Sequence, residues 1–386
     1  MNIRPFTIQI PEATISDLKS RLSQTRWPDS LDEASWDSGA SLHYMKQLVE
    51  YWRENFDWRA QETAINEFHQ FQTGIDGLTI HFIHERGAGP NPIPLIITHG
   101  WPGSFVEMLK ILPRLSDPAA HGGDPKDAFD VVVPSLPGYG FSSRPTRPGT
   151  NAFRIADLWL KLMKGLGYER FAAQGGDWGA SVSTCLGLVY PENLLGLHLN
   201  YIPGSYQPSI GQDLPGLTLE ETEFLESQKQ WLETEFGYGF VQATKPQTLA
   251  FGLNDSPVGL AAWIVEKFRD WGDCDGDVER RFSKDELLTN VMIYWASETI
   301  HSSARLYREG RKRPLHFAAG DFVRVPCAVA RFAKEAPFPP RAWVERGYNV
   351  QRWTEFPSGG HFAALEEPAK LVEDIREFFR PLRNSL

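Results

Sequence analysis

A short turn at residues 174–179 constrains the fold of this chain more than any other stretch. It reads Gln-Gly-Gly-Asp-Trp-Gly and has the form Gly-x-nucleophile-x-Gly, with Asp177 at the nucleophile position. A strand-like run, residues 168–173, precedes the turn, and a run typical of a buried helix, residues 180–189, follows it. A strand, a sharp turn and a helix are the context of a nucleophile elbow, in which flanking glycines make room for a strained nucleophile. The turn therefore predicts an α/β fold with Asp177 as a reactive side chain at the end of a strand.

The rest of the chain alternates between apolar strand-like runs and helix-like segments, which favours the same fold class. Short continuous apolar runs are typical of parallel strands that are buried on both faces. The last helix-like segment carries Leu371, Ile375 and Phe379 as an i, i+4, i+8 stripe. The expected strands cover residues 78–83, 94–98, 129–134, 168–173, 194–199, 327–332 and 350–356. We therefore predict an α/β fold with a mostly parallel central sheet flanked by helices.

Two segments depart from this alternation and divide the chain into regions. The expected regions are an N-terminal extension at residues 1–75, an α/β core at residues 76–202 and 316–386, and a helical cap at residues 203–315. The expected elements outside the core are a strand at 6–10, helices near 15–22 and 44–56, and cap helices at 219–236, 259–271 and 284–307. A helical insertion after a core strand predicts a lid over the ends of the strands.

Charge and cysteine content exclude several classes of function. The 386-residue chain has a net charge of −10, which disfavours nucleic acid as a partner. Its three cysteines, Cys185, Cys274 and Cys327, are an odd and widely spaced set that fits neither a zinc site nor a disulfide framework. The N-terminus has no apolar core of signal-peptide length, and no stretch approaches the roughly 20 apolar residues of a membrane span. We therefore expect a soluble, cytoplasmic protein without a membrane anchor, and we leave a homodimer open.

Three candidate catalytic residues fall on loops that follow expected strands, where the functional groups of an open α/β sheet gather. They are Asp177, Glu335 and His361. Their order along the chain, nucleophile then acid then histidine, is that of an α/β-hydrolase triad. Taken singly, each residue also fits an ordinary loop or surface position. Their joint order in the appropriate loops is what favours a catalytic triad.

An aspartate nucleophile indicates a particular chemistry. A carboxylate is charged at neutral pH, since its reference pKa is about 3.9, and it can attack an sp³ carbon directly to give an alkyl ester. Water activated by His361 would then attack the ester carbonyl, while Glu335 orients the imidazole. The backbone N–H groups of Trp101 and Trp178 are the expected donors to the oxyanion. Asp177 therefore points away from ester and amide substrates and towards epoxides or alkyl halides.

The two leaving groups, a halide ion and an epoxide oxygen, need different catalytic assistance. A halide leaves unaided and is steadied by indole N–H donors, whereas an epoxide oxygen leaves as an alkoxide and needs an acid. Phenols, with a reference pKa of about 10, suit that role at neutral pH. The cap region offers several tyrosines, and the sequence pattern alone does not select among them. They are Tyr201, Tyr206, Tyr238, Tyr294 and Tyr307.

Several longer motifs carry a family resemblance. The motifs are Phe-Thr-Ile-Gln-Ile-Pro at residues 6–11, Arg-Trp-Pro at 26–28, His-Gly-Trp-Pro-Gly-Ser-Phe at 99–105, the cap block at 253–262, Gly-Gly-His-Phe-Ala-Ala at 359–364, and Glu-Glu-Pro at 366–368. Through them the chain resembles the microsomal-type epoxide hydrolases, a branch of the α/β-hydrolase superfamily, over nearly its whole length. The resemblance implies a soluble member, because the family's membrane-bound members carry an N-terminal anchor ahead of the segment with which this chain begins.

The resemblance also implies a role for individual residues. Asp177 falls on the nucleophile, His361 on the base and Glu335 on the acid of the triad. Tyr238 and Tyr307 fall on the two tyrosines that protonate the epoxide oxygen. The implied partners are a small apolar epoxide and water, with no cofactor and no metal, and the N-terminal extension is expected to wrap around the cap.

Two other functions remain as alternatives. A haloalkane dehalogenase shares the Asp elbow and the Trp after it, but it would carry halide-binding donors in place of the paired phenols of Tyr238 and Tyr307. A non-catalytic relative that only binds ligands is the alternative from another class, and five intact catalytic residues count against it. The leading hypothesis is hydrolysis of an epoxide to a vicinal diol through an ester on Asp177.

Overall fold

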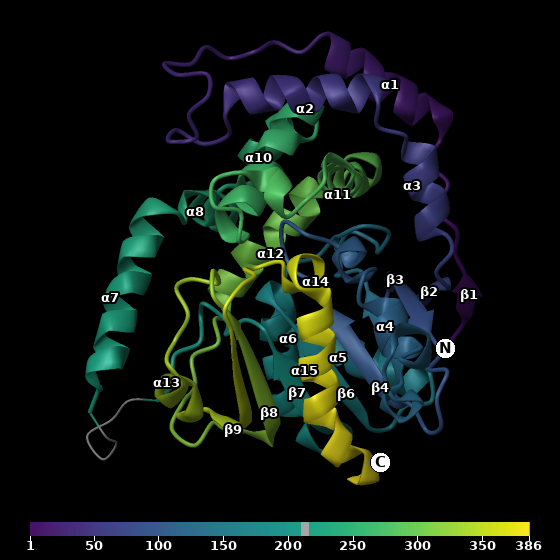
Figure 1. The fold of residues 1–386 in the computed structure, drawn as a ribbon, viewed down its shortest axis with the longest axis vertical. Coiled ribbons are helices and arrows are strands. Elements are labelled where there is room, and N and C mark those ends of the chain that lie inside the picture. Colours follow the sequence, from purple (N-terminus) through teal and green to yellow (C-terminus); the bar gives the residue numbers. More distant parts are fainter. Residues whose placement is uncertain (210–215, 386) are drawn as a thin grey trace.

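The computed structural model of the protein describes residues 1–209 and 216–385, and a nine-stranded sheet forms its centre (Figure 1). The strand order is β1-β2-β3-β5-β4-β6-β7-β8-β9. Strands β1, β2, β3 and β5 pair antiparallel, whereas β5, β4 and β6 to β9 pair parallel. The strands are β1 (Ile3–Pro5), β2 (Gln70–Ile75), β3 (Leu78–Glu85), β4 (Ile93–Thr98), β5 (Phe129–Pro134), β6 (Phe171–Gly175), β7 (Leu194–Leu199), β8 (Val323–Phe332) and β9 (Tyr348–Phe356).

Helices cover both faces of this sheet, which confirms the predicted fold class. Every residue of β4, β5 and β7 is buried, as the continuous apolar runs require. Helices α5 and α6 pack on one face, and α4 and α15 pack on the other (Figure 1). The core helices are α4 (Leu112–Ser116), α5 (Ala152–Gly165), α6 (Asp177–Val189), α13 (Arg341–Glu345), α14 (Ala363–Glu366) and α15 (Pro368–Phe379).

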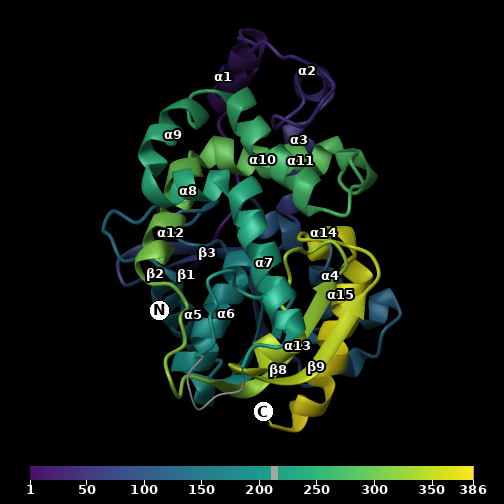
Figure 2. The same ribbon diagram turned by 90° about the vertical axis from the view of Figure 1, so that its left-hand side faces the viewer.

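A group of helices connects β7 to β8; α8 to α12 lie over one end of the sheet, and α7 runs down beside it (Figures 1 and 2). These helices are α7 (Leu219–Thr234), α8 (Gly237–Thr244), α9 (Pro246–Leu253), α10 (Pro257–Trp271), α11 (Lys284–Ser297) and α12 (Ile300–Lys312). The single helix expected at residues 284–307 is wrong, because Glu298 adopts a left-handed conformation with φ of 51° between α11 and α12. A left-handed residue ends a helix, so the chain turns there before α12 begins.

The N-terminal segment runs from the far edge of the sheet to the top of these helices (Figure 1). It contains α1 (Glu12–Ser23), α2 (Leu42–Glu54) and α3 (Trp58–Ile65), and α1 and α2 pack on α10 and α11. Polar contacts join the N-terminal segment to the helices between β7 and β8. Arg21 lies 2.8 Å from the Asp255 carboxylate, and the Tyr51 hydroxyl donates to Asp285 at 2.9 Å. The segment also contributes β1 and β2 to the sheet, which the sequence pattern did not predict.

The strand expected at residues 6–10 is also wrong, since the strand at this end covers Ile3–Pro5. Ile8 and Ile10 are buried, so the apolar alternation is real. Their backbone N–H groups, however, donate to side chains of the α3 region, to Asn66 Oδ1 at 2.9 Å and to Glu62 Oε1 at 2.7 Å. Side chains therefore replace the neighbouring strand that a sheet would need.

Among the described residues, none of the helices combines the length and the apolar character that a membrane crossing requires.

Candidate active site

The turn between β6 and α6 holds Asp177 in a strained conformation with φ of 46°. Close packing around the turn explains its two glycines. A Cβ atom on Gly175 would lie 2.3 Å from the carbonyl carbon of Gly179, and one on Gly179 would lie 1.8 Å from the carbonyl oxygen of Thr98. No larger residue fits at either position, and the turn therefore has the local geometry of a nucleophile elbow.

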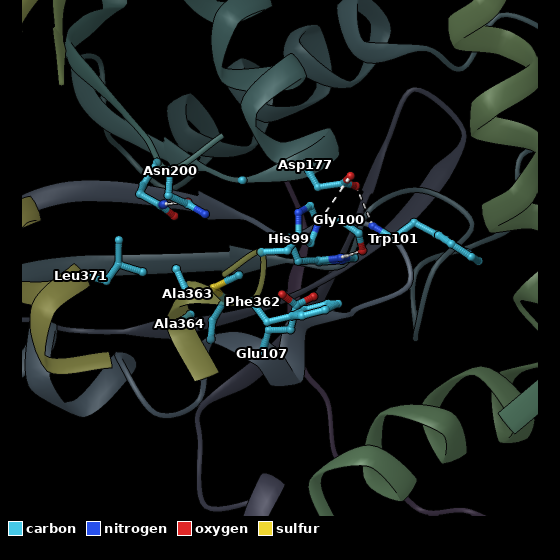
Figure 3. Close-up of a pocket in the computed structure, with 14 residues that line it drawn as sticks. His99, Gly100, Trp101, Glu107, Asp177, Asn200, Phe362, Ala363, Ala364 and Leu371 are labelled. Atoms are coloured by element: carbon cyan, nitrogen blue, oxygen red, sulfur yellow. Dashed lines mark hydrogen bonds and ion pairs between the residues drawn. The ribbon is translucent and has the colours of Figure 1, made fainter. Parts of the chain in front are cut away.

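The Asp177 carboxylate is held by the backbone of two tryptophans. The Trp101 N–H donates to Asp177 Oδ1 at 2.8 Å, as Figure 3 shows, and the Trp178 N–H also bonds the carboxylate. Burial raises the pKa of Asp177, while the nearby His361 and the two backbone N–H groups act in the opposite direction. Two N–H donors converge on this carboxyl, which is the arrangement that an oxyanion at the Asp177 carbonyl would need.

His361 lies between Asp177 and Glu335. Glu335 follows the end of β8, and His361 lies in the loop between β9 and α14. His361 Nδ1 is 2.9 Å from Glu335 Oε2, and His361 Nε2 is 3.7 Å from Asp177 Oδ2. Burial disfavours the charged imidazole, but the carboxylates of Glu335 and Asp177 outweigh it and raise the pKa of His361 to about 9. The Glu335 contact leaves Nε2 facing Asp177.

Two cap tyrosines meet above Asp177. Tyr238 belongs to α8 and Tyr307 to α12, their ring centres are 5.8 Å apart, and their hydroxyl groups are hydrogen-bonded. Trp101 stacks on Tyr238 at 5.1 Å, and Trp178 meets Tyr307 edge-on at 5.1 Å. Burial is the largest cause that raises the pKa of both phenols above their usual range, so both stay protonated at neutral pH.

The other three candidate tyrosines use their hydroxyl groups differently. Tyr206 donates to the backbone carbonyl of Trp343 at 3.2 Å, and Tyr294 donates to that of Gly103 at 2.7 Å. The hydroxyl of Tyr201 accepts a hydrogen bond from a backbone N–H. Their hydrogen bonds to the backbone distinguish them from the Tyr238–Tyr307 pair, whose hydroxyls bond each other.

A cavity of about 1230 Å³ connects these groups. Asp177, Glu335 and His361 line it together with Tyr238 and Tyr307. Much of the remaining wall is aromatic and comes from the cap, the core and the N-terminal segment. These aromatic residues include Trp36, Trp178, Tyr201, Phe224, Trp231, Phe236, Trp271 and Trp343. The site therefore favours a substrate with a large apolar part.

Sequence reasoning missed two residues that contact the tyrosine pair and the histidine. The Lys267 ammonium is buried and lies 4.8 Å from the ring centre of Tyr238. Trp271 lies 5.1 Å from the His361 ring. A lysine inside an apolar helical stretch was the available signal for Lys267, since a buried lysine needs a partner.

His99 supports the turn that carries Trp101. Its Nδ1 lies 3.0 Å from the Gly100 carbonyl oxygen, and its Nε2 accepts the Leu136 backbone N–H at 3.2 Å. Burial lowers the pKa of His99 to about 4, so the ring is neutral and fits this pair of contacts. His99 thus fixes the backbone that presents the Trp101 N–H to Asp177.

Comparison with known families gives two overlapping matches. The family described as "Epoxide hydrolase N terminus" matches residues 3–108, and the family described as "alpha/beta hydrolase fold" matches residues 93–368. Among curated proteins, the chain is 40% identical over 402 residues to epoxide hydrolase 1 of Oryctolagus cuniculus, with 98% of this chain and 88% of that protein covered.

Solved structures give the same result. Juvenile hormone epoxide hydrolase from the silkworm Bombyx mori is similar with a TM-score of 0.84 at 30% identity, covering 99% of this chain and 94% of that one. The epoxide hydrolase of Aspergillus niger is similar with a TM-score of 0.85 at 30% identity, covering 99% of this chain and 97% of that one.

Proposed function

This chain belongs to the epoxide hydrolase family, and on that premise we propose that it opens apolar epoxides to vicinal diols through an ester on Asp177. The observation that carries the proposal is that one cavity is lined by the Asp177 carboxylate, the His361–Glu335 pair and the Tyr238–Tyr307 pair. A nucleophile, a base and an acid therefore face the same space, as a two-step hydrolysis needs.

In the first half-reaction, Asp177 Oδ2 attacks one epoxide carbon and the ring C–O bond breaks. Tyr238 or Tyr307 gives its proton to the leaving oxygen, which becomes the first hydroxyl of the product. The paired hydroxyls support this role because one phenol can bond the phenolate that the other becomes. The Lys267 ammonium lies 4.8 Å from the Tyr238 ring centre and is itself paired with the Glu266 carboxylate at 2.6 Å.

In the second half-reaction, water loses one proton to His361 Nε2 and its oxygen attacks Cγ of Asp177. The Trp101 and Trp178 N–H groups bond the resulting oxyanion, in keeping with their contacts to the carboxylate. The intermediate collapses, the diol oxygen leaves and takes the proton from His361, and the proton left on the Asp177 carboxyl restores the phenol. Glu335 holds the imidazole and stabilises its charged form.

The aromatic wall supports an apolar substrate, and the tyrosine pair supports an epoxide over an alkyl halide. A halide needs no proton from Tyr238 or Tyr307 when it leaves. The juvenile hormone epoxide hydrolase of Bombyx mori shares the fold with this chain. By that similarity, terpene-like epoxides are reasonable first substrates, alongside aryl epoxides.

We also propose a division into an N-terminal extension at residues 1–75, a core at 76–202 and 316–386, and a cap at 203–315. The placement of helices α7 to α12 between β7 and β8 supports it. A cytoplasmic location is proposed from the three cysteines, which are free and buried in the structure.

A single turnover in ¹⁸O-labelled water, with enzyme in excess over styrene oxide, tests the proposal. We expect the label on the peptide that contains Asp177 and none in the diol, because the diol receives an old carboxylate oxygen. Asp177→Asn should lower diol formation by at least about 10³-fold. Label in the diol and none on Asp177 would show direct attack by water and would overturn the ester mechanism.

A further inference from the structure

A second, much smaller cavity of about 20 Å³ also borders the Asp177 side chain. Asp177 and His361 line it, as they line the large cavity, together with Gln174 and Glu107. Figure 3 shows Asp177 and Glu107 in this lining. A polar cavity of more than about 10–15 Å³ can hold one water molecule. The amide oxygen of Gln174 is buried and has no hydrogen-bond partner among the described residues, so this wall offers an acceptor to water.

Glu107 is the charged residue of this cavity that the ester mechanism above does not use. It lies in the short 3₁₀ turn Phe105–Met108 after β4, and 7% of its surface is exposed. The carboxyl group accepts the backbone N–H of Ser104. It occupies the space beside Gly103, since a Cβ atom on that glycine would lie 1.3 Å from Glu107 Oε1. The glycine thus makes room for a carboxyl at the cavity wall.

The charge of Glu107 is linked to both catalytic groups. Burial raises the pKa of Glu107 to about 8, His361 acts to lower it, and Asp177 acts to raise it. When Asp177 becomes a neutral ester its influence disappears, and when His361 is the neutral base the opposite influence of His361 disappears as well. A carboxyl oxygen of Glu107 can accept a hydrogen bond from water in either protonation state, so the cavity keeps an acceptor at the stage when water has to react.

We propose that Glu107 holds and orients the water that hydrolyses the ester. The water occupies the small cavity, donates one O–H to a carboxyl oxygen of Glu107, and directs the other O–H to His361 Nε2. The proton goes to His361, the water oxygen bonds to Cγ of Asp177, and the ester C–O bond then breaks to release the diol. Glu107 keeps its own protonation state through this step and acts by positioning the reacting oxygen.

This inference rests on the proposed ester mechanism, and rapid-quench mass measurement separates the two. Enzyme in excess is mixed with styrene oxide and quenched in acid, and the intact mass reports how the ester on Asp177 forms and decays. For Glu107→Gln we expect ester formation within about twofold of wild type and ester decay about 10–100-fold slower. The ester should therefore accumulate in the variant.

A second variant displaces the Glu107 carboxyl without changing Glu107 itself. Gly103→Ala places a methyl group where Glu107 Oε1 lies, and it should slow ester decay in the same selective way. It carries the test if Glu107→Gln does not fold.

The matched control is Glu366, another buried carboxyl near His361. Burial raises the pKa of Glu366 to about 7, but its oxygens accept the backbone N–H groups of Asp273 at 2.7 Å and Phe362 at 2.9 Å. It does not line the small cavity. Glu366→Gln should leave the ratio of ester formation to ester decay as in wild type.

Selective slowing of decay in Glu107→Gln and Gly103→Ala, without it in Glu366→Gln, supports the assignment. If the ester decays at the wild-type rate in Glu107→Gln, or if ester formation and ester decay slow equally, the assignment of Glu107 is overturned while the ester mechanism stands. Absence of any ester in the wild-type enzyme overturns the ester mechanism and this inference together.

Discussion

The two cavities that Asp177 lines differ in size and in lining. The large one, about 1230 Å³, is lined by many aromatic side chains from three regions of the chain, with charged side chains among them. The small one, about 20 Å³, is enclosed by the His99–Trp101 turn, Glu107 and the loop after His361. Asp177 and His361 line both. On the mechanism proposed above, the substrate reacts from the large cavity and the water from the small one, and both reach the same carboxyl group.

This separation makes a general prediction about substitutions. Apart from the His361–Glu335 pair, which acts on the water, a change in the large cavity should alter ester formation, and a change in the small cavity should alter ester decay. The catalytic residues that face both spaces are the ones whose loss stops the cycle. The experiments below test the separation, from the largest expected effect to the smallest.

The largest effect is expected for the double variant Tyr238→Phe with Tyr307→Phe. Without a phenol proton, the epoxide oxygen has to leave as an alkoxide, and ester formation should fall by about 10³-fold. Rapid-quench mixing with styrene oxide, followed by measurement of the intact mass of the protein, would give that rate. Each single variant should lose less, since the remaining phenol can still donate. Wild-type ester formation in the double variant would remove the tyrosines from the mechanism and break the comparison.

A smaller effect is expected for Glu335→Gln, on ester decay. The Glu335 carboxylate helps raise the pKa of His361 to about 9, so its loss lowers that pKa. Decay requires the neutral imidazole. The rate of ester decay should therefore increase with pH over a range that lies about one pH unit or more lower than in the wild-type enzyme. The plateau should fall by about 10²-fold, because glutamine holds the imidazole less firmly. If the pH dependence of the ester decay rate were the same in Glu335→Gln as in the wild-type enzyme, the role of Glu335 would be contradicted.

The smallest effect is expected for Gly310→Ala in α12. The new methyl group would lie 2.7 Å from the Trp178 ring, which lines the large cavity and supports Tyr307. Ester formation from a bulky aryl epoxide should fall by about tenfold, the lower end for one methyl group in an apolar pocket. Ester decay should not change. A slower decay with unchanged formation would show that the two cavities are not functionally separate.

The parts of the site that the sequence predicted are those encoded by consecutive residues. Asp177 and the Trp178 N–H lie side by side in one glycine-flanked turn, and the His99–Trp101 turn supplies the second N–H. Such motifs define their geometry locally. His361 and Glu335 could be expected because loops after parallel strands meet at one edge of a sheet.

The remaining parts depend on contacts between distant segments. Nothing in the pattern separates Tyr238 and Tyr307 from Tyr294, whose hydroxyl bonds the Gly103 carbonyl, and only the family resemblance selected the pair. Glu107 reads in sequence as an ordinary residue near the start of a helix. Its importance emerges only when β4, β6 and the loop after β9 enclose a cavity around it.

The errors in local structure have the same cause. Residues 6–10 alternate like a strand, but side chains near α3 take their hydrogen bonds. Glutamate is a good helix former, so no local signal marks Glu298 as the break between α11 and α12. At residues 6–10 tertiary contacts outweigh local preference, and at Glu298 a distant side chain, Arg144, donates to the carbonyl oxygen at 3.3 Å.

The central claim is that Asp177 forms an ester with the substrate and that His361 is needed only to remove it. Intact mass of the His361→Gln protein after mixing with styrene oxide tests this directly. The account predicts a gain equal to one epoxide, mapped to the peptide that contains Asp177, with no release of diol. An unmodified protein, under conditions where the wild-type enzyme makes diol, would contradict the account.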